Sequence, residues 1–165
     1  MKDDIDKIYT KLNSLETEVS NLRQGYVVVN QRYTEALNSL KELTTSASLA
    51  AKKACVAAEL AALATNKCAI AAKEAASKSV FEAAEAAADA AASSAEAAIH
   101  AAAAASAAAA AAATAIAHQT EASSMQASAE AAQSTKRATD AAAEAVKMSN
   151  MAADFARLAR NNHGK

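Results

Sequence analysis

Residues that form turns and large cores are nearly absent from this 165-residue chain. It contains no proline and no tryptophan, two glycines at Gly25 and Gly164, and five residues that are Tyr or Phe. Most β-sandwich, barrel and doubly wound folds need turn residues at each strand end, so this scarcity excludes them. The shortage of aromatic side chains argues against a compact domain with a large core, because aromatics bury the most area per residue.

Alanine occupies much of the chain instead, at 54 of the 165 positions. It has the highest helix propensity of any residue, and it buries little area when it packs. The composition therefore predicts an all-α fold made of long helices.

Motifs for catalysis or metal binding are missing as well. The sequence has no CxxC, no HExxH and no glycine-rich phosphate loop. On one helix, Cys55 and Cys68 would lie about 20 Å apart, too far for a disulfide, and His100 and His118 about 27 Å apart, too far to share a metal. We expect no enzyme activity, no cofactor and no metal ligand.

The charge pattern excludes further partners. A net charge of −1 and isolated basic pairs such as Lys52-Lys53 give no basic face for a nucleic acid. Residues 97–117 hold no charge and are long enough to span a membrane, but they are nearly all alanine and have no aromatic belt, so we expect no membrane partner. The charged start, Met1 to Asp4, predicts no signal peptide and a reducing compartment.

Residues 5–43 carry a heptad pattern of apolar residues. Their spacing alternates between three and four without a slip, which predicts the a/d seam of a left-handed coiled coil. The predicted oligomerisation residues are Ile5, Ile8, Leu12, Leu15, Val19, Leu22, Tyr26, Val29, Tyr33, Leu40 and Leu43, with Ala36 completing the series.

The composition of this seam favours a parallel homo-oligomer of three strands or more. Ile and Leu occur at both a and d, unlike the Ile/Val-at-a and Leu-at-d pattern of parallel dimers. Gly25 and the three valines that follow Tyr26 weaken the helix locally. Because the register passes through them, we expect a continuous helix there.

From Ser46 onwards large apolar residues become isolated among alanines. We divide the chain into a coiled coil at 1–45, an alanine-rich helical shaft at 46–124 and a C-terminal helix and tail at 125–165. A polar stripe through the shaft has eleven-residue spacing, which predicts a straight or slightly right-handed coil. Its members are Glu74, Lys78, Glu82, Glu85, Asp89, Ser93, Glu96 and His100.

Two arrangements of the shaft remain open. No Pro or Gly interrupts residues 26–163, which favours one continuous helix. The alternative is a helical hairpin that turns in the polar stretch 118–124 and places the acidic residues of 85–96 beside the basic residues of 136–160. Near the C-terminus, we expect a partner-docking patch made of Met148, Met151, Phe155 and Leu158.

A heptad zipper from Ile5 to Leu43, followed by alanine-rich runs at 83–117 and 123–145, resembles the shaft segments of tailed-bacteriophage fibre and whisker proteins. That resemblance implies a homotrimeric virion component, made in the host cytoplasm and bound to other structural proteins of the particle. The β-rich tip usual in that family has no counterpart here, which favours a shaft, connector or decoration role. From the residues alone, the alternative is a helical-bundle adaptor that captures a protein partner through its charged faces.

Overall fold

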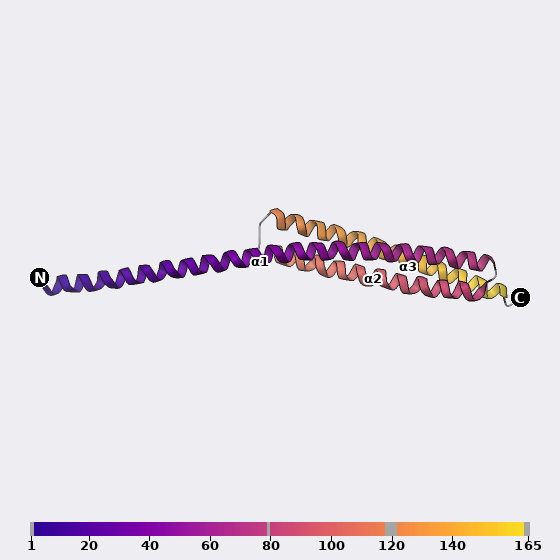
Figure 1. Ribbon diagram of the computed structural model, residues 1–165, viewed down its shortest axis with the longest axis horizontal. Coiled ribbons are helices and arrows are strands. Elements are labelled where there is room, and N and C mark those ends of the chain that lie inside the picture. Colours follow the sequence, from indigo (N-terminus) through magenta and orange to yellow (C-terminus); the bar gives the residue numbers. More distant parts are fainter. Residues whose placement is uncertain (1, 79, 118–121, 164–165) are drawn as a thin grey trace. The chain divides into compact units, whose positions relative to one another are not determined.

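The structure is a computed structural model that describes residues 2–78, 80–117 and 122–163 (Figure 1). It contains three helices, α1 (Lys2–Ser77), α2 (Phe81–Ile116) and α3 (Ala122–His163). The described residues include no β-strand. The all-α prediction is therefore confirmed.

The chain divides into two units, Met1–Leu40 and Lys41–Lys165. The first unit contains the N-terminal part of α1. The second contains the rest of α1 together with α2 and α3. The division falls a few residues before the change of composition near Ser46.

The first unit is a single helical segment. It passes through Gly25 without interruption, as the unbroken register predicted. The hydroxyls of Thr10, Thr17 and Thr34 each donate a hydrogen bond of 2.9 Å to the carbonyl four residues earlier, so these polar groups are satisfied within the helix. At 1.5 Å per residue, 39 helical residues extend about 58 Å.

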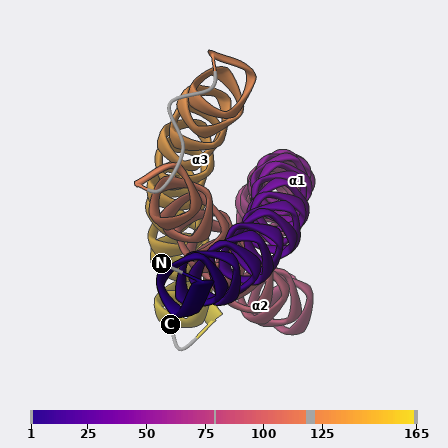
Figure 2. The ribbon, with the colours of Figure 1, turned by 90° about the vertical axis from the view of Figure 1, so that its left-hand side faces the viewer.

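The second unit is a three-helix bundle (Figures 1 and 2). One core cluster joins Ala51 of α1 to Ala112 of α2 and Ala131 of α3. Another, further along α1, joins Ala72 to Ala91 and Ala152. Residue numbers therefore rise along α1 and α3 and fall along α2, so α2 is antiparallel to both of its neighbours.

Small residues at seven-residue intervals form the centre of the bundle. Each of the three helices contributes one such series, and all members are 0–2% exposed. The series are Thr44, Ala51, Ala58, Thr65 and Ala72; Ala84, Ala91, Ala98, Ala105 and Ala112; and Ser124, Ala131, Ala138, Ala145, Ala152 and Ala159. Such short side chains let helices approach closely, and the bundle is held by many weak dispersion contacts.

The prediction of one unbroken helix over 46–124 is wrong. Helix α1 ends at Ser77 and α2 begins at Phe81. In this turn, Lys78 N donates to the Glu74 and Ala75 carbonyls at 3.2 Å, and Val80 N donates to Ala75 O at 3.0 Å. Reversal is favoured because it lets the small residues of each helix bury one another, whereas a lone helix would leave them in water.

The hairpin alternative is confirmed by the contact between α2 and α3. Thr135 of α3 donates a hydrogen bond of 3.0 Å to the carbonyl of Ala105 in α2. The reversal lies between Ile116 and Ala122, and residues 118–121 of the predicted turn, His118 among them, lie outside the described residues. The polar stripe that was expected to follow one helix therefore begins in α1 and continues in α2. In both helices the fully buried positions recur every seven residues, and not every eleven as the stripe predicted.

Candidate functional site

The largest apolar surface of the first unit is the predicted seam. Its side chains range from 49% exposed at Ile5 and Leu12 to 73% exposed at Leu22 and Tyr26. The others above half exposure are Ile8, Leu15, Val19, Val29, Tyr33 and Leu43, while Leu40 is half-buried. Apart from Leu40, these side chains are exposed among the described residues, so most of the seam lies open along the helix.

An open surface of this kind is unfavourable in water. Soluble monomers rarely expose a contiguous apolar patch of more than a few hundred Å². Burial of one Leu, Ile or Val side chain is worth about 1.5–3 kcal/mol. An isolated helix is also marginally stable, because most helical stability in proteins comes from packing of the apolar face. The seam is thus the surface at which association would stabilise the first unit most.

Four charged residues lie beside the seam, at its e and g positions. Lys11 and Glu18 occupy g positions, and Glu16 and Arg23 occupy e positions, next to the a/d residues. None of the four forms an ion pair with another described residue of the chain. These charges are available to residues of another molecule.

The predicted docking patch near the C-terminus is divided between two environments. Met148 and Phe155 are half-buried and pack against the core cluster of Ala69, Ala72, Ala91 and Ala152. Met151 and Leu158 are 40% and 55% exposed. The reason is helical geometry, since each pair is seven residues apart and the two pairs lie on different lines of α3.

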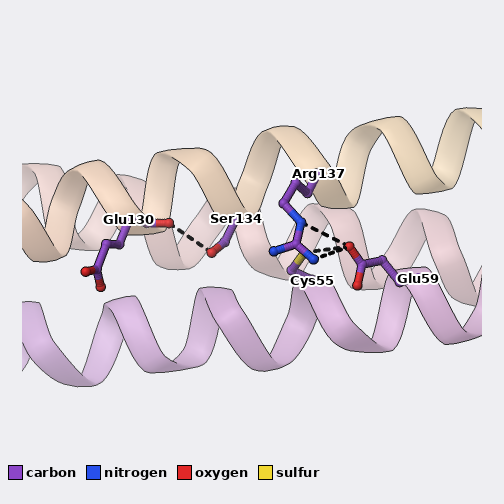
Figure 3. A network of polar contacts seen from close by, with 5 residues as sticks. All are labelled: Cys55, Glu59, Glu130, Ser134 and Arg137. Carbon is purple, nitrogen blue, oxygen red and sulfur yellow. Dashed lines mark hydrogen bonds and ion pairs between the residues drawn. The ribbon is translucent and has the colours of Figure 1, made fainter.

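A polar cluster joins α1 to α3 (Figure 3). The guanidinium of Arg137 donates two hydrogen bonds to Glu59 Oε1, from Nη2 at 2.6 Å and from Nε at 3.1 Å. The thiol of Cys55 donates to the same oxygen at 3.7 Å. One turn away, Ser134 Oγ donates to the Glu130 carbonyl at 2.9 Å. The Glu130 carboxylate accepts from Lys52 Nζ at 2.6 Å.

This cluster is suited to holding helices together rather than to chemistry. Burial, and then the neighbouring Glu59 carboxylate, raise the pKa of the Cys55 thiol above its ordinary 9.0, so the thiol stays protonated near neutral pH. Hydrogen bonds from Lys52 and Gln126 lower the pKa of Glu130 and keep it ionised. The adjacent groove, about 450 Å³ in volume, is lined mainly by these already paired groups.

A second contact closes the other end of the bundle. Arg160 of α3 forms an ion pair with Glu85 of α2, and its guanidinium lies 5.5 Å from the centre of the Phe81 ring. Phe81 is one of the few aromatic residues and is the first residue of α2. The contact ties the end of α3 to the start of α2, which the charge pattern of the predicted hairpin had indicated.

The described residues hold no group of three His, Cys, Asp or Glu able to bind a metal. His100 is exposed, and its Nε2 atom lies 3.8 Å from Oε1 of Glu96 in the same helix. Helices α1 and α2 each contain a stretch that is long and apolar enough to cross a membrane, a test that core helices of soluble proteins also pass.

No protein-family model, no curated protein and no solved structure matches this chain. Its function must therefore be inferred from the seam, the bundle and the charges that surround them.

Proposed function

We propose that this protein is a structural component that self-associates through the seam of residues 5–43 and carries a three-helix bundle on each chain. The observation that supports this most is the run of exposed a and d side chains from Ile5 to Ala36, on a segment that makes no core of its own. Another copy of the same helix is the partner that a heptad seam fits best, because its a and d residues meet the same spacing.

The charges beside the seam favour a parallel arrangement. In a parallel coiled coil, a g residue faces the e residue five positions later on the neighbouring helix. Lys11 would then face Glu16, and Glu18 would face Arg23, so both pairs are attractive. In an antiparallel pair with Ile5 opposite Leu43, e positions face each other and g positions face each other, so Glu18 would face Arg32 but Arg23 would face Arg23 of the neighbouring helix. We therefore propose parallel strands in register, with three strands favoured by the mixture of a and d residues.

The assembly we propose is a rod, fibre or decoration on a larger particle, most simply the virion of a tailed bacteriophage. The resemblance of the zipper and alanine-rich runs to phage shaft segments supports this proposal. The second unit buries alanines against one another, whereas the first unit has no core of its own and needs other chains to complete its packing. The chains would be held at the zipper while each bundle remains a separate module.

Sedimentation of the full-length protein tests the proposal. The wild type should sediment as a multiple of 16.7 kDa, with three chains expected. Leu15→Asp with Leu22→Asp places charges in the seam and should yield the mass of one chain at low protein concentration. The control Asn13→Asp with Ser20→Asp adds the same charge on the opposite face and should leave the oligomer unchanged.

A cross-linking experiment tests the orientation separately. With both native cysteines changed to alanine, Leu15→Cys should form a disulfide between chains only if the strands are parallel and in register. An oligomer that fails to cross-link would overturn the orientation and keep self-association. A wild-type monomer would overturn the proposal itself and favour the adaptor alternative, in which the bundle captures a different protein.

A further inference from the structure

A second apolar stripe runs along α1 within the bundle, on the side that faces away from α2 and α3. Leu49, Val56, Leu63 and Ile70 follow one another at intervals of seven and are 52–60% exposed. Leu60 lies between Val56 and Leu63 on the same side and is also exposed. We call these five residues the α1 stripe. It is separate from the seam, since all five belong to the second unit.

Lysines accompany this stripe. Lys53 and Lys67 lie on the same helical line as Leu60, seven residues before and after it. Both are exposed, and neither forms an ion pair with another described residue. Fourteen residues of helix place their Cα atoms about 21 Å apart. The α1 stripe is thus a surface of large aliphatic groups with two free cations at a defined spacing.

The outer face of α2 has the opposite character. Glu82, Asp89 and Glu96 follow one another at intervals of seven, and all three are exposed. Glu82 and Glu96 are also about 21 Å apart along the helix. The adjacent line, four residues further along, consists mainly of short exposed side chains, at Ala86, Ser93, His100 and Ala107. We call these two lines the α2 face. It offers carboxylates at the spacing of the lysines, and a strip of mostly short side chains beside them.

We propose that the α1 stripe of one copy packs on the α2 face of a second copy. The large aliphatic side chains lie against the line of Ala86, Ser93, His100 and Ala107, where three of the four side chains are short. Lys53 and Lys67 then meet the two glutamates, Glu82 and Glu96. The two surfaces are different, so each copy still has one surface of each kind free. Such a heterologous contact propagates into a ring or a filament.

The charges favour the α2 face of a second copy over two other surfaces that could cover the α1 stripe, namely a second α1 stripe and an anionic membrane. If two copies packed stripe on stripe, Lys53 and Lys67 of one copy would face the same lysines of the other, and the contact would be repulsive. An anionic lipid surface would match the lysines, but the acidic line of the neighbouring α2 would be repelled by it, and the stripe has no aromatic residue of the kind that favours a membrane interface. The α2 face of a second copy satisfies both the charges and the sizes of the side chains.

The test uses the full-length chain carrying Leu15→Asp and Leu22→Asp, so that the seam no longer associates. This background protein should still self-associate at high concentration, and less strongly as salt is raised. Lys53→Glu with Lys67→Glu should weaken this association about tenfold or more, because two attractive pairs become repulsive. Glu82→Lys with Glu96→Lys should have the same effect. The four changes in one chain should restore association.

Mixing the two charge variants distinguishes a heterologous contact from general charge effects. One variant retains the α2 face and the other retains the α1 stripe, and their exchanged charges also complement each other, so an equimolar mixture should associate in alternation although neither variant does so alone. The control variants change the same number of charges on α3, with Lys136→Glu and Lys147→Glu, or Asp140→Lys and Glu144→Lys. Neither control should alter association. Leu60→Gln with Leu63→Gln, two exposed sites, should weaken it without loss of helix by circular dichroism.

Three results would overturn the inference. The background protein could stay monomeric at all concentrations. The α3 control variants could reduce association as much as the two charge variants do. The monomer could bind phosphatidylserine vesicles, with Lys53→Glu and Lys67→Glu abolishing that binding. The last would assign the stripe to a lipid surface. None of these results bears on the seam, because the wild-type oligomer is measured independently.

Discussion

The two units of this protein use side-chain size in opposite ways. Residues 2–40 carry large Ile, Leu, Val and Tyr side chains on one face and leave them exposed, whereas the bundle buries Ala, Ser and Thr almost completely. Large side chains on one helix need another helix to cover them. Small ones can be covered by a chain that folds back on itself, because helices lined with methyl groups fit closely. In the first unit the large side chains are left for association, whereas in the bundle the small side chains form the core.

The tight centre of the bundle gives the largest expected effect. Ala105 is fully buried, while its neighbour Ala104 is exposed. Ala105→Leu forces extra volume between three close helices and should lower the free energy of unfolding of the bundle by about 3 kcal/mol. Urea denaturation measures this. Ala104→Leu is the matched control and should change the unfolding free energy little, and equal losses for both variants would contradict the burial pattern.

The first unit should be sensitive to the opposite change, from a large side chain to a small one. Leu22→Ala removes a large side chain from the seam and should weaken association of the chains by about 2 kcal/mol per chain. The stability of the bundle should not change. Analytical ultracentrifugation over a range of concentrations measures the first effect, and urea denaturation the second. Gln24→Ala, on the outer face, is the control, and a bundle destabilised by Leu22→Ala would show that the two units are not independent.

Replacement of the glycine inside the zipper should give a smaller change, a gain in helix stability. No atom lies within 4 Å of the position that a Cβ would take at Gly25. Gly25→Ala should therefore stabilise the helix by about 1 kcal/mol through its higher helix propensity. The thermal transition of the first unit should rise, as followed by circular dichroism. A lower transition temperature would show that a neighbouring chain needs the space next to Tyr26.

The smallest effect concerns pH and the polar contact between α1 and α3. The pKa of Glu130 is lowered from its ordinary 4.5 by hydrogen bonds from Lys52 and Gln126. The stabilisation that the ionised Glu130 gives the bundle is therefore fully present above pH 4.5, and it is lost as pH falls through the lowered pKa. Denaturation between pH 7 and pH 3 should show a small loss for the bundle that Lys52→Gln reduces. If the pH dependence of that variant is the same as that of the wild type, the contact between Lys52 and Glu130 does not stabilise the bundle.

Much of the first unit could be predicted from residues close together in the sequence. The register from Ile5 to Leu43 predicts a helix with one apolar face, and the structure contains that helix and leaves that face open. The reversals were harder to predict, since no Gly or Pro marks the turn at 78–80. Helix α2 begins after Val80, and no side-chain hydrogen bond caps it there, so a local capping signal was missing as well.

The contacts of the bundle could not be predicted in the same way. Arg137 and Glu59 are 78 residues apart, and no local pattern pairs them. The α1 stripe was visible only as isolated large residues, because its direction depends on which face of α1 the other two helices cover. Met148 and Phe155 were expected at a docking surface for the same reason, and the packing of α3 turns them towards the core.

The sequence by itself determined the helical state of the chain, the open heptad seam and the lack of recognisable catalytic motifs, because propensity and periodicity depend on neighbouring residues. The tertiary structure alone decided that the chain also reverses between Ser77 and Phe81, and which alanines are buried. Long runs of one residue carry almost no local information that separates Ala104 from Ala105. Only the close approach of three helices makes one of them core and leaves the other in water.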